Sequence, residues 1–159
     1  MPGFDAATFR TVLGHFCSGI TIVTAVDAGE PVGLTCQSFS SVSLDPPLVL
    51  FVPAKSSSSW PRIRHAGHFC ANVLADDQEE LGRRFAIKGV DKFAGVGWRS
   101  GVTGAALLEG CLAHVECEVE AVHDAGDHDI AVGRVVDLGT SGEGHPLLFY
   151  RGGYGRFAV

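Results

Sequence analysis

The chain has 159 residues, of which 46% are hydrophobic and 19% are charged, and this length predicts one globular domain over residues 1–159. Its formal net charge of -6 argues against a nucleic-acid backbone as the main partner, because proteins that bind one present basic surfaces. No apolar run approaches the roughly 20 residues of a membrane span, and no basic and apolar leader is present, so we expect a cytoplasmic protein.

The first predicted element is an amphipathic helix that Asp5 caps, with Phe4 placed to pack back onto it. Gly19 stands just past its end, as helix-terminating glycines do. The helix is predicted from apolar residues that keep the i, i+3, i+4, i+7, i+8 spacing of one helical face: Phe9, Val12, Leu13, Phe16 and Cys17.

A hairpin and a serine-rich stretch follow this helix. Residues 20–26 are β-branched, residues 27–31 predict a turn, and a returning strand begins at Val32. That strand runs into small hydroxyl residues, which offer hydroxyls and N–H groups without bulky obstruction.

The next segment predicts a strand, a loop and a short helix. The apolar run 48–52 is typical of a strand buried on both faces. It leads into residues 53–61, where a lysine and four serines precede a short helix opened by proline. A helix start collects free N–H groups and therefore suits a phosphate. The same composition also fits a hairpin followed by a serine-rich loop without a ligand.

The middle of the chain alternates between regular elements and a long loop. Residues 61–66 predict a short helix and residues 68–74 a strand. Asp76 or Asp77 is placed to cap a helix over residues 78–86, with Leu81 and Phe85 facing inward. Residues 88–104 have no clear period and predict a long loop, which is often functional.

The last third predicts a long hairpin and a final strand. Residues 111–122 alternate as a half-exposed strand does, with Glu116 among the residues on its polar face. A turn at 124–127 and a partner strand over 128–138 place His128 near the hairpin's mouth. A last strand over 146–150 precedes the tail. Six or seven short strands with few helices predict a mainly β fold, a closed β-barrel with peripheral helices.

Several motifs that would define another class of site are missing from the sequence. No GxGxxG or GxxxxGK[ST] pattern occurs, which argues against a Rossmann or P-loop site. The histidines lack aligned carboxylates, so no metal site is predicted. The cysteines are odd in number and form no CxxC pair, and they are typical of reduced, mostly buried small residues: Cys17, Cys36, Cys70, Cys111 and Cys117.

The chain resembles the short-chain flavin reductases, the reductase components of two-component flavin-dependent monooxygenases. The similar segments cover nearly the whole chain in the family's order: residues 9–10, 14–24, 38–49, 69–74, 85–86, 92–93, 126–128 and 146–150. Four further points are most similar to the reductase partner of an actinobacterial hydroxylase that acts on a phenolic intermediate of steroid degradation: Cys17, Gln37, residues 91–95 and residues 98–99.

This resemblance implies a homodimeric, Greek-key, FMN-binding split β-barrel. It also implies an NADH-dependent reductase that passes reduced FMN, or FAD, to an oxygenase hydroxylating an aromatic or phenolic substrate. The implied flavin contacts are Thr35, Cys36, Gln37 and Ser38 at the isoalloxazine edge, Ser41 near the ribityl chain, Lys55, Ser56 and Ser59 near the phosphate, and Phe85, Lys92 and Phe93 from the loop, across a dimer interface.

The nicotinamide of NADH is expected to meet His128, the implied catalytic residue, and Tyr154. From local sequence alone, residues 126–128 favour a turn that only closes a hairpin, and Tyr154 favours a packing anchor. The sequence shows no arginine cluster ready for a 2′-phosphate, which favours NADH over NADPH.

Two other functions remain open from the sequence. A non-catalytic flavin- or haem-binding module on the same barrel, acting as a sensor or carrier, predicts tight retention of its cofactor. A reductase predicts only moderate flavin affinity, because its product must leave. An oxidase of the pyridoxamine phosphate type has less support, because no basic cluster for a second phosphate is obvious among the 12 lysines and arginines.

Overall fold

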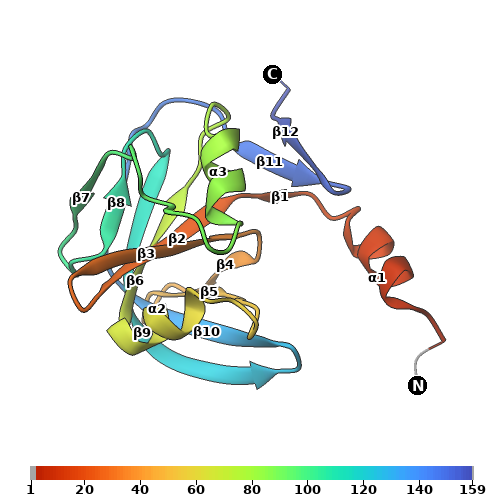
Figure 1. Cartoon of the computed structure of the whole chain (residues 1–159), viewed down its shortest axis with the longest axis horizontal. Coiled ribbons are helices and arrows are strands. Elements are labelled where there is room, and N and C mark those ends of the chain that lie inside the picture. The colour runs from red at the N-terminus through yellow and green to blue at the C-terminus, as the bar shows by residue number, and fades with distance from the viewer. Residues whose placement is uncertain (1–2, 159) are drawn as a thin grey trace.

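The computed structural model describes residues 3–158 and is mainly β, with three helices and twelve strands in that part of the chain (Figure 1). The predicted β architecture with peripheral helices is therefore confirmed. In chain order the elements are α1 (Ala6–Leu13), β1 (Ser18–Gly19), β2 (Thr21–Asp27), β3 (Glu30–Cys36), β4 (Phe39–Ser43), β5 (Leu48–Phe51), α2 (Trp60–Ala66), β6 (His68–Val73), α3 (Glu79–Phe85), β7 (Trp98–Ser100), β8 (Ala106–Leu108), β9 (Ala113–Ala125), β10 (His128–Thr140), β11 (Leu147–Tyr150) and β12 (Gly153–Arg156).

The main sheet has seven strands in the order β3-β2-β6-β9-β10-β5-β4. Its two edge strands, β3 and β4, are consecutive in the chain, and Gln37 and Ser38 join them. Val32 from one end of the sheet and Phe51 from the other pack in a single buried cluster. The sheet is therefore rolled around its core, and the predicted barrel is confirmed with a split between β3 and β4.

Helix α2 closes the barrel core. Its Trp60 and Ile63 are buried in the cluster that the seven strands enclose. The Trp60 ring meets Phe51 edge to face at 5.5 Å between centroids, and its Nε1 donates to Asp129 Oδ2 at 2.9 Å. The predicted short helix opened by proline is confirmed. The Trp60 ring is packed in the core and its N–H group has a hydrogen-bond acceptor, as is usual for a buried tryptophan.

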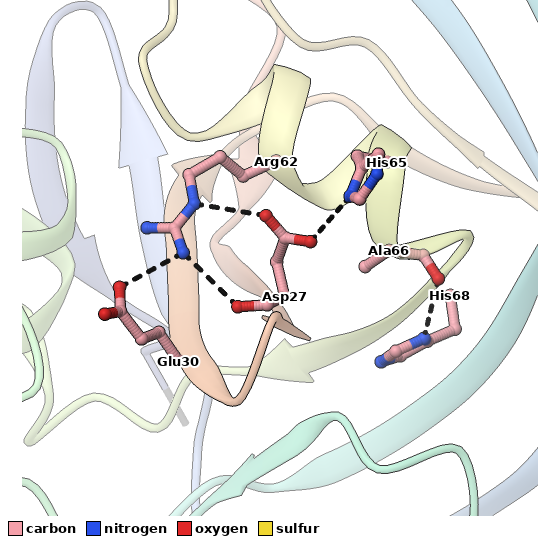
Figure 2. A network of polar contacts seen from close by, with 6 residues as sticks. All are labelled: Asp27, Glu30, Arg62, His65, Ala66 and His68. Carbon is pink, nitrogen blue, oxygen red and sulfur yellow. Dashed lines mark hydrogen bonds and ion pairs between the residues drawn. The ribbon is translucent and has the colours of Figure 1, made fainter.

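A network of polar contacts ties α2 to the β2–β3 hairpin (Figure 2). Arg62 Nε donates to Asp27 Oδ2 at 3.3 Å, and its second nitrogen reaches Glu30 Oε2 at 3.2 Å. His65 Nδ1 lies 2.7 Å from Asp27 Oδ1. The hydrogen bond from His65 lowers the pKa of Asp27, and the contact with Arg62 adds to this. The network holds α2 in place, directly after residues 52–59, which join β5 to α2 and are called the serine loop.

A second cluster packs on the other face of β2. It joins Ile20 and Ile22 to Phe85 of α3, Leu108 of β8 and Leu147 of β11. Strand β11 pairs with β1 on one side and with β12 on the other in a separate three-stranded sheet, so the tail after residue 150 contains a strand. The described helices include none that is long and apolar enough to cross a bilayer.

Helix α1 begins as predicted but ends early. Thr8 N donates to Asp5 Oδ1 at 2.8 Å, and the Phe4 and Phe9 rings stack at 6.2 Å. The helix ends at Leu13 with Gly14 as its C-cap, so the prediction that Gly19 follows its end is wrong. The reason is that Gly19 pairs with β11 and belongs to a strand.

Two other local predictions are also wrong. Neither Asp76 nor Asp77 caps α3: Gln78 is its N-cap residue, and it bridges Ala75 N and Glu109 O at 2.9 and 3.0 Å. The loop predicted over residues 88–104 contains a strand, because β7 finds its partner in β8.

Burial also departs from the predicted patterns on two strands. In β5 only Val49 and Phe51 are buried, while Leu48 and Leu50 are half-buried, because β5 lies next to an edge of the sheet and has one covered face. Glu116 is 1% exposed, although the sequence placed it on the polar face of β9 and residues 117–120 after it alternate as predicted. Its carboxylate accepts from the N–H groups of Val102 and Thr103 at 3.2 and 3.0 Å and from the Thr103 hydroxyl at 2.7 Å.

All five cysteines are free, and four of them are buried, with Cys17 exposed. This confirms the expectation of mostly buried cysteines. Burial raises the pKa of the Cys111 thiol to about 11 and that of Cys117 to about 12, so both stay protonated and unreactive at neutral pH.

Candidate functional site

A cleft of about 420 Å³ opens where the β3–β4 corner meets the loop after β5, the end of α3 and the C-terminal strand. It brings together nine of the thirteen residues predicted for the site, from six separate parts of the chain. These nine are Thr35, Cys36, Gln37, Ser38, Ser56, Phe85, Lys92, His128 and Tyr154.

The other four predicted residues do not line this cleft. Ser41 is exposed on β4, and the Lys55 ammonium pairs with the Asp124 carboxylate at the hairpin tip, which raises the pKa of Lys55. Ser59 is buried beneath Lys92, and the Phe93 ring packs on Phe85 at 4.9 Å between centroids.

The hydroxyl groups of the β3–β4 corner tie the walls of the cleft together. Thr35 Oγ1 donates to Gly82 O of α3 at 2.6 Å. Ser38 Oγ both donates to Val52 O and accepts from Val52 N at 3.1 Å, and Cys36 Sγ lies 3.2 Å from the same hydroxyl. The hydroxyl hydrogens of Thr35 and Ser38 are thus already used in hydrogen bonds within the protein. What the corner offers a ligand is therefore its backbone and the exposed Gln37 amide.

Two lysines bring positive charge into the cleft. Lys88 Nζ donates to Ser56 O at 2.6 Å, and Lys92 Nζ donates to Gly33 O at 2.9 Å and to Ser59 Oγ at 3.2 Å. Both ammonium groups thus meet neutral oxygens, and within residues 3–158 neither has a carboxylate partner within ion-pair distance. Burial lowers the pKa of Lys92. The charge of both lysines is therefore available to an anion.

Lys88 is the site residue that sequence reasoning missed. It belongs to residues 88–104, which were predicted only as a long loop, and no sequence motif distinguishes it from the other residues of that loop. Only the fold brings Lys88 to the site, because the loop after α3 crosses to the serine loop and places both Lys88 and Lys92 there.

The start of α2 contributes less than predicted to an anion site. Ser57 Oγ accepts from the N–H groups of Ser59 and Trp60, each at 3.2 Å, so these two donors are already satisfied. The N–H groups of Ser56 and Ser58, both in residues that line the cleft, have no hydrogen-bond partner in the described chain. The loop before the helix, and not the helix start, is the part that can receive a phosphate.

His128 stands at the rim of the cleft, where the β9–β10 hairpin touches the serine loop. Lys55 N donates to Asp127 O at 2.9 Å, and Ala54 bridges to His128. His128 Nδ1 lies 2.7 Å from Asp127 Oδ1, a contact that lowers the pKa of Asp127. The imidazole is half-buried, and its ring is fixed by one nitrogen, which leaves the other for a ligand.

The floor of the cleft depends on one close approach between backbone and ring. A Cβ atom on Gly33 would lie 2.9 Å from the Phe85 ring and 3.2 Å from Val23 O, so only glycine admits Phe85 at this depth. Phe85 is fully buried, which makes it a packed support for the cleft and not a free stacking surface.

Comparisons with known proteins find a matching family model and similar sequences. Residues 13–158 match the family model described as "Flavin reductase like domain". The chain is 53% identical over 150 residues, covering 94% of this chain and 77% of the relative, to the reductase subunit HsaB of a flavin-dependent monooxygenase from Rhodococcus jostii.

Two solved structures are similar over almost all of the chain. Nitrilotriacetate monooxygenase component B from Mycobacterium thermoresistibile superposes with a TM-score of 0.93 and 49% identity, covering 96% of this chain and 86% of that one. The NADH:FAD oxidoreductase SgcE6 from Streptomyces globisporus, in complex with NAD and FAD fragments, superposes with a TM-score of 0.92 and 39% identity, covering 97% and 93%.

Proposed function

Because this chain belongs to the flavin reductase like domain family, we propose that it is an NADH-dependent flavin reductase. It supplies reduced FMN or FAD to a partner oxygenase that hydroxylates an aromatic substrate. The observation that carries this proposal is that Lys88 and Lys92 both meet the serine loop in one cleft, where neither ammonium group has a carboxylate partner among residues 3–158. A cleft of this charge suits the phosphate and the anionic reduced ring of a flavin.

The chain's own residues bind the flavin and orient it. Lys88 and Lys92, with the N–H groups of Ser56 and Ser58, hold the phosphate. The β3–β4 corner with Gln37 faces the edge of the ring system. When bound, a flavin supplies the acceptor for the hydride at C4 of NADH, so the protein contributes placement and electrostatics and needs no nucleophile.

His128 is the proposed catalytic residue. Asp127 fixes one ring nitrogen, so the other faces the cleft, where it donates to the nicotinamide carboxamide or lies near the negative charge of the reduced ring. Tyr154 lines the same cleft from β12 and is proposed to meet the nicotinamide. Among the described residues no arginine lines the cleft, which supports NADH over NADPH.

We propose that the protein is a homodimer and that α1 contributes to the interface. The helix stands away from the barrel (Figure 1), and Phe9, Val12 and Leu13 on its apolar face are each more than half exposed, at 53%, 61% and 53%. A helix that leaves such a face uncovered is typical of an element that a partner covers. The cytoplasmic location stays part of the proposal and is supported by five free cysteines.

Steady-state oxidation of NADH by the purified protein tests the proposed activity. We expect oxidation that depends on added FMN or FAD and saturates with flavin, and a lower kcat/KM with NADPH. A rate no higher than that of NADH with flavin alone, at protein concentrations where the chain is folded, would contradict the proposal.

A further inference from the structure

The ring of Tyr154 is covered by a cation from helix α3. The guanidinium carbon of Arg83 lies 4.6 Å from the centroid of the Tyr154 ring, within the range of a cation–π contact. Phe149 meets the same ring edge to face at 5.2 Å. Tyr154 is half-buried and lines the cleft, so part of its surface borders the space proposed for the ligand.

Arg83 is itself held in place within its helix. Its Nε donates to Glu79 Oε2 at 3.0 Å, one turn earlier. This i, i+4 pair orients the planar guanidinium. The side chain of Arg83 remains 59% exposed, so packing alone does not fix it.

Tyr154 also packs against the second cluster. Within residues 3–158, strand β12 pairs only with β11, in the small sheet outside the barrel. Among residues 3–158 the phenol hydroxyl has no hydrogen-bond partner. Apolar packing is not directional, whereas Arg83 and Phe149 contact the ring in defined geometries. These two contacts therefore orient the ring relative to α3, which ends in Phe85 at the floor of the cleft.

We propose that Arg83 is a positioning residue that holds the Tyr154 ring in the cleft wall, where the ring meets the nicotinamide of NADH. This inference rests on the proposed function and deepens it. Arg83 acts through Tyr154 and does not line the cleft itself. Its loss is expected to affect the use of NADH and to leave the binding of the flavin phosphate, which lies with Lys88 and Lys92, unchanged.

A double-mutant cycle tests this route of action. Arg83→Ala and Tyr154→Ala are each expected to raise KM for NADH about fivefold, with KM for flavin within about twofold of wild type. If Arg83 acts through Tyr154, the double variant resembles Tyr154→Ala. Additive effects would show that Arg83 contacts the dinucleotide directly, and an unchanged KM in Arg83→Ala would show that it has no role; either result overturns the proposal.

Two replacements of Arg83 separate its charge from its bulk. Arg83→Lys keeps a cation for the ring and is expected to restore KM for NADH to within about twofold of wild type. Arg83→Met keeps an apolar stem and is expected to behave as Arg83→Ala. Equal behaviour of the lysine and methionine variants would overturn a role for the cation. Urea unfolding of every variant checks that the fold is kept.

A measurement without NADH keeps this test separate from the proposed function. The chain has two tyrosines, so in a Tyr150→Phe background the tyrosinate absorbance reports Tyr154 alone. Burial raises the pKa of Tyr154, and Arg83 opposes this rise. Arg83→Ala in that background is therefore expected to titrate at a higher pH, and Arg83→Lys close to the parent. An unchanged titration would show that the guanidinium does not lie over the ring in solution, even if the protein reduces flavin.

Discussion

The Nδ1 atom of His128 lies 2.7 Å from the Oδ1 atom of Asp127 at the tip of the β9–β10 hairpin. The hairpin tip is fastened to the serine loop through Lys55 N and Asp127 O, so one short segment sets both the position and the orientation of the imidazole. Residues 127–128 therefore close the hairpin and also hold the imidazole at the rim of the cleft.

Replacing His128 is therefore expected to affect turnover more than flavin binding. We expect His128→Ala to lower kcat/KM for NADH about tenfold or more, and Asp127→Asn, which leaves the imidazole without its anionic partner, to have a smaller effect in the same direction. His123→Ala, an exposed histidine of the same hairpin, is the matched control. Equal kinetics of His128→Ala and wild type would remove His128 from the mechanism.

Lys88 and Lys55 give a direct comparison of two candidate phosphate ligands. Only Lys88 directs its ammonium into the cleft, since the Lys55 ammonium pairs with Asp124. We expect Lys88→Met to weaken FMN binding about tenfold, which corresponds to one lost charge-assisted hydrogen bond. Lys55→Met should change it less than about threefold, and riboflavin, which has no phosphate, should bind both variants as it binds wild type.

Equilibrium titration of flavin fluorescence measures these affinities. A larger loss of FMN affinity in Lys55→Met than in Lys88→Met would mean that the lysine beside the serines, and not the one delivered by the loop, holds the phosphate.

The lowered pKa of Lys92 predicts a pH dependence of flavin binding. Burial disfavours its charged form and moves its pKa below the ordinary 10.5. The ammonium is present below that pKa and is lost as the pH rises through it. FMN affinity should therefore decline on the alkaline side at a lower pH than an ordinary lysine would give, while riboflavin affinity stays level.

Lys92→Arg keeps its charge over this range and should abolish the decline without abolishing FMN binding. Parallel pH profiles for FMN and riboflavin in the wild-type protein would show that Lys92 does not contact the phosphate.

If the exposed apolar face of α1 lies in the dimer interface, a charged substitution on that face should disrupt the dimer. Val12→Glu places a charge on the apolar face and should shift the protein from dimer to monomer, as measured by light scattering after gel filtration. Thr11→Glu, on the opposite face of the same helix, should leave the mass unchanged. A monomeric wild-type protein at micromolar concentration would contradict the proposed homodimer.

Local patterns in the sequence were enough to place most strands and helices. The β-branched run before the first turn, the proline at the start of α2 and the glycine after residue 125 each act on their neighbours alone, and the elements that they predict are confirmed. The end of α1 was predicted wrongly because Gly19 pairs with β11, which lies about 130 residues away in sequence, and local patterns carry no information on such a distant pairing.

The candidate site was predictable where its residues share a strand corner and not where it is assembled by distant loops. The resemblance implied Thr35 to Ser38 as neighbours at the end of one strand, and they line the cleft together. Lys88 reaches the cleft only because the loop after α3 crosses to Ser56. Glu116 shows the same limit: its alternation predicts a polar face, and only the loop of Val102 and Thr103 turns that position into a buried carboxylate with three donors.

The structure of the protein with FMN tests the account most directly. A crystal soaked with FMN should show the phosphate between the Ser56–Ser58 loop and the Nζ atoms of Lys88 and Lys92, with the ring edge at the β3–β4 corner beside Gln37. Density for FMN at another surface, with both lysines still bound only to Ser56 O and Gly33 O, would contradict the proposed flavin site.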